Sequence, residues 1–244
     1  MKIHLLLKKE EIDSIQMDQN KIAVVFDVLL ATSTITACLN FGAKCVIPVM
    51  DENEALLEAK NYHPEEIALV GEYNGLTIGG FHNPAPSFLK DHVRGKTVIL
   101  STTNGTVAIR KSSSAKKVYA ASLLNGEAVS EHIAKTISDE TIIVVCSGSS
   151  NQFCMEDFYG AGYFIKKFTE LVNEENVELT DSAQASMLFY ESFSNNAYQV
   201  LDHTRVGKML NAYELQEDIR FVSQQGTMSM IPQLIDGKSI ATGD

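Results

Sequence analysis

Short runs of apolar, often β-branched residues recur through the first 150 positions, and they constrain the fold more than any other feature of the chain. Most of these runs are continuously apolar rather than alternating, which is typical of strands that are covered on both faces. We predict strands over six ranges: Ile22–Phe26, Cys45–Val49, Ile67–Val70, Thr97–Leu100, Val118–Ala120 and Thr141–Val145.

Helix-like stretches such as Glu52–Lys60 and Gly126–Thr136 separate several of the runs. Further along, apolar residues follow a helical period over Phe158–Val172, and the segments from Ser182 and from Thr204 also look helical. Strands that alternate with helices indicate an α/β fold. We therefore predict a three-layer α/β/α sandwich with a largely parallel or mixed sheet and a helical C-terminal third.

Composition agrees with one large α/β domain over residues 1–244, because 45% of the residues are apolar, 21% are charged and no linker divides the chain. The formal net charge of −11 would repel nucleic acid and anionic membranes, so small molecules or metal cations are the expected partners. The apolar run Ile3–Leu7 is too short for a signal peptide or a membrane span, which favours a cytoplasmic location. The four cysteines lack CxxC spacing, and we expect reduced thiols.

Ligands of open α/β sheets bind outside the carboxyl ends of the strands, so the residues that follow each predicted strand are the candidate site. Asp27 follows the first strand, and Thr32, Ser33 and Thr34 fall at the expected start of a helix. Asp27 can hold a cation while the hydroxyls and free helix N–H groups hold an anion. A helix cap beside an ordinary strand-end acid explains this junction equally well.

Two further junctions carry acids or hydroxyls. Glu72 lies within Gly71–Gly75, a segment that by itself predicts a surface turn. The third junction holds Thr102, Thr103, Asn104 and Gly105, whose hydroxyls and backbone N–H groups suit an oxyanion. Asn-Gly is also a strong hairpin signal, but the residues that follow do not alternate as a returning strand should, which favours an anion-binding loop.

The fourth junction is the small-residue loop Cys146–Ser149, followed by Glu156 and Asp157 at the start of a helix. Acids are common in a first helical turn because the helix dipole stabilises them. Hard oxygen ligands at several strand ends are nevertheless what Mg²⁺ requires, since it takes few protein carboxylates and is completed by water and substrate phosphate.

Several other site classes are excluded by spacing. The chain has no Gly-x-x-x-x-Gly-Lys-Ser/Thr sequence, so it lacks a P-loop. Neither Cys146 nor Cys154 has an arginine shortly downstream, as a cysteine phosphatase would need. The six histidines show no zinc-protease spacing.

Taken together, these blocks resemble the 2-phosphosulfolactate phosphatase family, known as ComB-like, over nearly the whole chain. The resemblance rests on Val25–Thr34, Gly71–Glu72, Gly80–Phe81 with Asn83–Pro84, Thr102–Thr106, Ser122 with Asn125, Glu156–Asp157 with Ala161–Gly162, and Arg205–Leu210. It implies magnesium-dependent hydrolysis of 2-phosphosulfolactate to 3-sulfolactate and phosphate, a step of coenzyme M biosynthesis, on an α/β/α fold that forms a homodimer.

The expected site follows from the residues and the resemblance together. Asp27, Glu156 and Asp157 hold Mg²⁺, and Asp27, Glu72 and Asp157 are the catalytic carboxylates. The substrate-binding set is Thr32, Ser33, Thr34, Thr102, Thr103, Asn104, Gly105 and Asn125. The nucleophile is an activated water or an aspartate that forms a phosphoryl intermediate.

Two departures from the family pattern leave alternatives open. Leu30 and Tyr73 stand where members of the family usually carry arginine, so two permanent positive charges are missing. One alternative is a phosphatase for a different, less charged small phosphate ester. The other is a degenerate family member that binds a small anion without turnover.

Overall fold

The strands of the computed structural model form around the apolar runs, and the model describes residues 1–172, 174–236 and 238–241. The six predicted strands are present as β2, β3, β4, β6, β7 and β8. The strands are β1 (Lys2–Leu6), β2 (Lys21–Phe26), β3 (Cys45–Val49), β4 (Ile67–Tyr73), β5 (Leu76–Thr77), β6 (Thr97–Ser101), β7 (Lys117–Ala121), β8 (Thr141–Cys146), β9 (Glu178–Leu179), β10 (Pro232–Ile235) and β11 (Lys238–Ala241).

Helices fill most of the intervals between strands and dominate the chain after β8. The α-helices are α1 (Ala31–Asn40), α2 (Glu52–Ala59), α3 (Gly105–Lys111), α4 (Gly126–Thr136), α5 (Met155–Val172), α6 (Asp181–Phe193), α7 (Ala197–His203), α8 (Arg205–Ala212) and α9 (Gln216–Val222). The 3₁₀ turns are η1 (Lys9–Glu11), η2 (Pro64–Glu66), η3 (Pro86–Phe88) and η4 (Glu174–Asn176). The predicted helical C-terminal third is confirmed.

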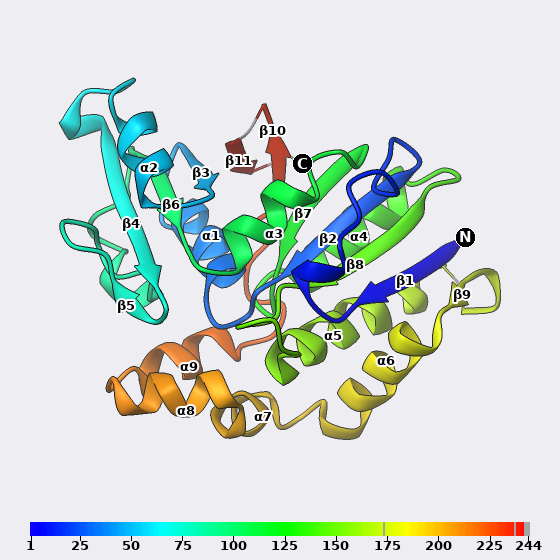
Figure 1. Ribbon diagram of the computed structural model, residues 1–244. Helices are drawn as coiled ribbons and strands as arrows, with labels where there is room; N and C mark the ends of the chain where they lie inside the picture. Colours follow the sequence, from blue (N-terminus) through cyan, green and yellow to red (C-terminus); the bar gives the residue numbers. More distant parts are fainter. Residues whose placement is uncertain (173, 237, 242–244) are drawn as a thin grey trace.

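In the described part of the chain the strands form one mixed sheet in the order β5-β4-β6-β3-β11-β10-β7-β2-β8-β1-β9. Strands β7, β2, β8 and β1 pair in parallel with one another, and so do β3, β6 and β4. The antiparallel hairpin of β10 and β11 joins the two groups by pairing with β7 and β3 (Figure 1, red). The sequence analysis did not predict this hairpin.

Side chains of β2 show why its sequence is continuously apolar. Ile22, Val24 and Phe26 pack into a buried cluster with α4, α5 and α6, whereas Ala23 and Val25 pack into a second cluster with α1 and α3. Each large apolar side chain buried this way contributes about 1.5–3 kcal/mol. Helices therefore cover both faces of the sheet, which confirms the predicted three-layer α/β/α arrangement.

Helix α5 approaches its neighbours closely at two glycines. A Cβ at Gly160 would lie 2.7 Å from Val28 Cγ2, and one at Gly162 would lie 2.1 Å from the Ser186 backbone oxygen. The absence of a side chain at Gly160 thus lets α5 press against the chain that leaves β2. Since α5 carries Glu156 and Asp157 in its first turn, this packing brings both acids beside the end of β2.

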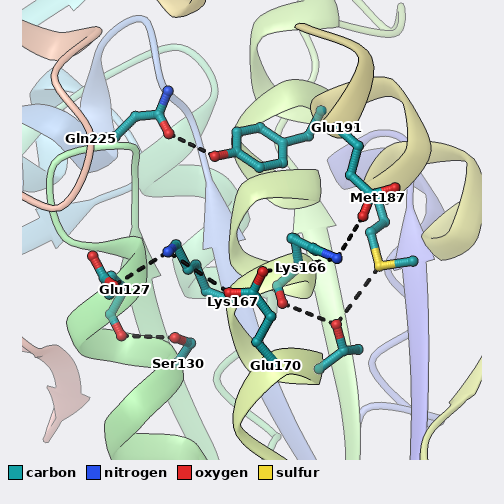
Figure 2. A network of polar contacts seen from close by, with 10 residues as sticks. Glu127, Ser130, Lys166, Lys167, Glu170, Met187, Glu191 and Gln225 are labelled. Atoms are coloured by element: carbon teal, nitrogen blue, oxygen red, sulfur yellow. Dashed lines mark hydrogen bonds and ion pairs between the residues drawn. The ribbon is translucent and has the colours of Figure 1, made fainter. Parts of the chain in front are cut away.

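A charged network ties the opposite end of α5 to the helices on either side of it (Figure 2). Lys166 Nζ lies 2.7 Å from Glu191 Oε1 of α6, and Lys167 Nζ lies 3.4 Å from Glu127 Oε1 of α4. Both lysines also approach Glu170 at 3.8 Å. Such half-exposed pairs contribute little individually, about 0–1 kcal/mol. Apolar packing is therefore the main force that holds α5 in place.

Helices α7, α8 and α9 lie across the lower edge of the molecule, where the arrowheads of β2 and β4 point (Figure 1, orange). This segment packs against α5 and η3, and Val206, Leu210 and Ile219 join the buried cluster there. Among the described residues, none of the helices combines the length and apolarity that a membrane crossing requires.

Candidate active site

A cavity of about 290 Å³ opens where the ends of β2, β4, β6 and β8 meet the C-terminal helices. Its walls carry Asp27, Thr103, Asn104, Ser149, Glu156 and Arg205, together with Asp157 and Met209. A narrower extension beside it is lined by Asp27, Glu72, Leu30 and Thr102. Residues that lie up to 182 positions apart in the sequence are therefore assembled around one hollow.

Asp27 lines both hollows, and its side chain is almost completely buried. Burial, followed by the negative charges of Glu72 and Glu156, raises the pKa of its carboxyl group to about 7. The Ala31 backbone N–H and the Lys9 charge oppose that rise in pKa. Near neutral pH the cavity therefore holds a carboxyl group that readily exchanges a proton or gains a cation.

Gly105 lets the loop after β6 lie directly against Asp27. A Cβ at this position would lie 2.6 Å from Asp27 Oδ2 and 2.5 Å from Ala31 Cβ, which is closer than real Cβ contacts. Helix α3 begins at Gly105, so the hairpin alternative for Asn104-Gly105 is wrong and the loop turns into a helix instead. Gly105 is placed behind Asp27, not on the cavity wall.

Glu72 fastens the loop after β6 to the hairpin of β4 and β5. Its Oε1 accepts a hydrogen bond from Thr103 N at 2.7 Å, and its Oε2 accepts from Gly75 N at 2.7 Å and from Thr103 Oγ1 at 3.0 Å. Thr103 Oγ1 in turn accepts from Asn74 N at 2.9 Å. Both carboxylate oxygens of Glu72 therefore stabilise the shape of the site.

Asp157 and Glu156 are adjacent but have different surroundings. Asp157 Oδ1 accepts from Val28 N at 2.9 Å, and its Oδ2 accepts from Gly148 N at 3.1 Å, so it joins the ends of β2 and β8. Burial and the charges of Asp27 and Glu156 raise its pKa. Burial also raises the pKa of Glu156, against hydrogen bonds from its own backbone N–H and from the Cys154 and Thr204 side chains.

These contacts allow a test of Asp157. In Asp157→Asn, one of the two backbone N–H groups would face an amide N–H₂ group and lose its acceptor. We expect the free energy of unfolding to fall by about 1–3 kcal/mol, measured by urea denaturation. Asp139→Asn, a change at an exposed loop acid, is the matched control. Lost turnover at unchanged stability would show instead that Asp157 serves chemistry and not structure.

The hydroxyls at the start of α1 face backbone groups. Thr32 Oγ1 accepts from Asp27 N and donates to Asp27 O, both at 3.0 Å. Ser33 Oγ donates to Val28 O at 2.8 Å, and Thr34 Oγ1 donates to Pro84 O at 2.7 Å. None of the three lies on the cavity wall, so they position Asp27 and the turn after it.

Thr102 and Asn125 are the remaining predicted residues. Thr102 lines the narrow extension, and its Oγ1 accepts from Thr106 N at 3.2 Å. Asn125 is fully buried after β7, where its Oδ1 accepts from Ser122 N and its Nδ2 donates to Ala120 O and Met230 O. Asn125 therefore lies away from the cavity.

Sequence reasoning gave no role to Arg205, the first residue of α8. Its Nη2 donates to Ser149 O at 3.2 Å, and among the described residues it is the one lysine or arginine on the wall of the main cavity. Thr204 is the N-cap of α8 and accepts a hydrogen bond from Gly207 N at 2.9 Å. The N-cap pattern in the sequence therefore marks the start of α8, where Arg205 lies. Most of the guanidinium donors remain available to an anion.

Leu30 and Tyr73, the two positions that lack the expected arginines, lie in different surroundings. Leu30 lines the narrow extension and packs against the core, where it gives that part of the hollow an apolar wall. Tyr73 is 68% exposed and lies outside the wall of both hollows.

The carboxylates suit a small hard cation that keeps part of its water. Among the described residues, no three His, Cys, Asp or Glu side chains converge closely enough to enclose a metal ion. Asp27 and Glu156, however, face the cavity, and backbone N–H groups do not saturate them as they do Asp157. Mg²⁺ is commonly bound by one or two carboxylates plus water and substrate phosphate, so this donor set fits it.

Comparison with known proteins identifies related chains. A family model described as 2-phosphosulpholactate phosphatase matches residues 6–237. A relative from Clostridium perfringens strain SM101 is 38% identical over 249 residues, which cover 100% of this chain and 98% of the relative. One from Clostridium acetobutylicum is 35% identical over 240 residues, 98% of this chain and 99% of the relative. Both are named probable 2-phosphosulfolactate phosphatase, in agreement with the resemblance in the sequence blocks.

Proposed function

Because the chain belongs to the 2-phosphosulfolactate phosphatase family, we propose that it hydrolyses 2-phosphosulfolactate to 3-sulfolactate and phosphate in the cavity at Asp27. The observation that carries the proposal is the meeting of buried Asp27 and Glu156 with the Arg205 guanidinium in one hollow. Carboxylates alone would repel a polyanionic ester. A bound cation and the arginine offset that repulsion.

Asp27 and Glu156 would hold Mg²⁺, which supplies positive charge to the phosphoryl oxygens when bound. Asp157 and Glu72 keep the two loops around that position in place through their backbone hydrogen bonds. Asn104 offers an amide donor to the phosphoryl group from the side of β6. The attacking water would be oriented within the same hollow, and Asp27 or Glu156 is placed to accept its proton.

Arg205 would bind the sulfonate or carboxylate end of the substrate. It lies with Ser149 on the side of the cavity formed by β8 and α8, whereas Thr103 and Asn104 lie on the side formed by β4 and β6. A planar guanidinium with several free N–H donors suits a sulfonate or a carboxylate. The substrate would therefore extend from the loop after β6 to the start of α8.

The test of the proposal is release of phosphate and sulfolactate from racemic 2-phosphosulfolactate with excess Mg²⁺. O-phospholactate, which lacks the sulfonate, is the matched ester. We expect turnover of the first ester and a kcat/KM at least about tenfold lower for the second, because one charge-assisted contact is lost. The folded protein could release no phosphate from 2-phosphosulfolactate but release it from other small phosphate esters. That result would show that the substrate is another ester.

One observation favours that second candidate, a phosphatase for a less charged ester. Leu29, Leu30, Leu210 and Leu215 add apolar side chains to the wall of the narrow extension, beside its polar residues. A substrate with an apolar group would bury it there. A panel of small esters with and without apolar substituents separates the two candidates by their kcat/KM ratio.

A further inference from the structure

Lys9 is a buried cation placed just behind the candidate site. It is the first residue of η1, three positions after the end of β1, and its backbone N–H donates to Ser147 O at 3.1 Å beside the end of β8. Its side chain is 10% exposed, and it is the only lysine or arginine in the buried part of the described chain. Burying an ammonium group is costly unless it is paired or hydrogen-bonded, so its position calls for an explanation.

The ammonium group of Lys9 has two partners. Nζ donates to Asn104 Oδ1 at 2.8 Å, and it lies 3.0 Å from Glu10 Oε1. The Glu10 carboxylate is 31% exposed, so that ion pair is weak in water and does not by itself explain burial of the lysine. The bond to Asn104, which lies 95 residues further along the chain, links η1 to the wall of the cavity.

This bond decides which way the Asn104 carboxamide faces. An ammonium group is only a donor, so it must face the amide oxygen and not the amide N–H₂ group. Nδ2 is then turned away from Lys9, and among the described residues the Asn104 side chain makes its hydrogen bond through Oδ1 alone. Because Asn104 lines both the main cavity and its narrow extension, the N–H₂ group is left available to a ligand there.

We propose that Lys9 is a positioning residue that fixes the Asn104 amide with its N–H₂ group toward the cavity, where Asn104 donates a hydrogen bond to the phosphate group. The inference rests on the proposed function for the identity of the ligand and adds a residue to it. Without Lys9 the amide can rotate by a half turn and present its oxygen to the phosphate oxygens. Asn104 would then repel the group that it otherwise binds.

The test is a double-mutant cycle read by calorimetric titration with inorganic phosphate in the presence of excess Mg²⁺. We expect Lys9→Met to weaken phosphate binding about tenfold in the wild-type background, the size of one hydrogen bond to a charged group. In the Asn104→Ala background the same change should alter the dissociation constant less than about twofold. The matched control is Lys21→Met, at the end of β2 opposite Asp27. It removes the same charge and should leave phosphate binding unchanged.

Equal effects of Lys9→Met in both backgrounds would show that Lys9 acts by charge alone and would overturn the inference. So would an unchanged dissociation constant for Lys9→Met, or absence of phosphate binding by the wild type. Asn104→Asp provides a second test should Lys9→Met fail to fold. Its carboxylate should abolish phosphate binding, and retained binding would contradict the inference. The protein could bind phosphate in a way that needs Lys9 and yet fail to hydrolyse 2-phosphosulfolactate. That result would support the inference and refute the proposed function.

Discussion

Asp27→Asn should lower kcat for 2-phosphosulfolactate on the order of 10²–10³-fold, because the change removes a negatively charged ligand from the centre of the cavity. The amide has the same shape as the carboxylate and retains one oxygen beside the Ala31 backbone N–H, so the fold should survive. Steady-state phosphate release measures the effect, with the exposed Asp139→Asn as the control. Turnover and magnesium affinity that both match the wild type would reduce Asp27 to a structural strand-end acid.

In chelator, Asp27→Asn should also change how the free energy of unfolding depends on pH. The pKa of Asp27 is raised from an ordinary value of 3.8 to about 7 in the folded chain, so the folded state binds the proton more tightly than the unfolded state. The free energy of unfolding should therefore fall as pH rises from about 4 to about 7, by an amount on the order of 4 kcal/mol. Asp27→Asn should lose the part of this decline that Asp27 contributes, whereas Asp157 and Glu156, whose pKa values are also raised, still contribute theirs. The variant should be as stable as the wild type, or more stable, at pH 8.

Gly105→Ala should disrupt both the fold and the reaction. The new Cβ would lie 2.6 Å from Asp27 Oδ2 and 2.5 Å from Ala31 Cβ, so the loop after β6 or the end of β2 must shift. We expect a loss of about 1–3 kcal/mol in the free energy of unfolding, typical of overpacking. Displacement of Asp27 by a fraction of an ångström to an ångström should also lower kcat by about 10²-fold.

The matched control is Gly79→Ala, because a Cβ at Gly79 meets nothing within 4 Å. That variant should retain wild-type stability and turnover. Urea denaturation and phosphate release of the two alanine variants separate a local clash from a general effect of removing a glycine. A Gly105→Ala protein with normal turnover would mean that Asp27 tolerates displacement and is not at the centre of the reaction.

Sequence patterning predicted the layers well because burial on both faces leaves a strong signal. The side chains of β2 alternate between two buried clusters, and a continuously apolar run is the direct consequence. The hairpin of β10 and β11 has no such signal. Its short strands are joined to the sheet by single register pairs, Gln233 with Tyr119 and Ser239 with Val46, and those pairings depend on the rest of the fold being formed.

Two of the three Asn-Gly pairs of the chain illustrate the limit of local motifs. Asn74 and Gly75 both adopt positive φ, 51° and 83°, and form the two-residue turn between β4 and β5. Asn104 and Gly105 instead form the start of helix α3. Gly105 is required there because a side chain would clash with Asp27. Identical dipeptides thus serve a hairpin and a helix start, and tertiary contacts decide between them.

For the site, the sequence predicted which strand ends would matter but not how the residues would divide the work. It assigned both Glu156 and Asp157 to the metal and only Asp157 to catalysis, whereas both carboxylate oxygens of Asp157 accept hydrogen bonds from backbone N–H groups and no such pair of bonds saturates Glu156. Arg205 and Lys9 received no role, because no local pattern records that the fold places Arg205 on the cavity wall and Lys9 behind Asn104.

The most direct measurement is phosphate release from 2-phosphosulfolactate by the wild-type protein, first in chelator and then after addition of excess Mg²⁺. The proposed site predicts negligible release in chelator and full restoration by Mg²⁺, since Asp27 and Glu156 would otherwise repel the ester. Release that is equally fast in chelator, or no release from folded protein under either condition, would contradict a magnesium phosphatase site at Asp27.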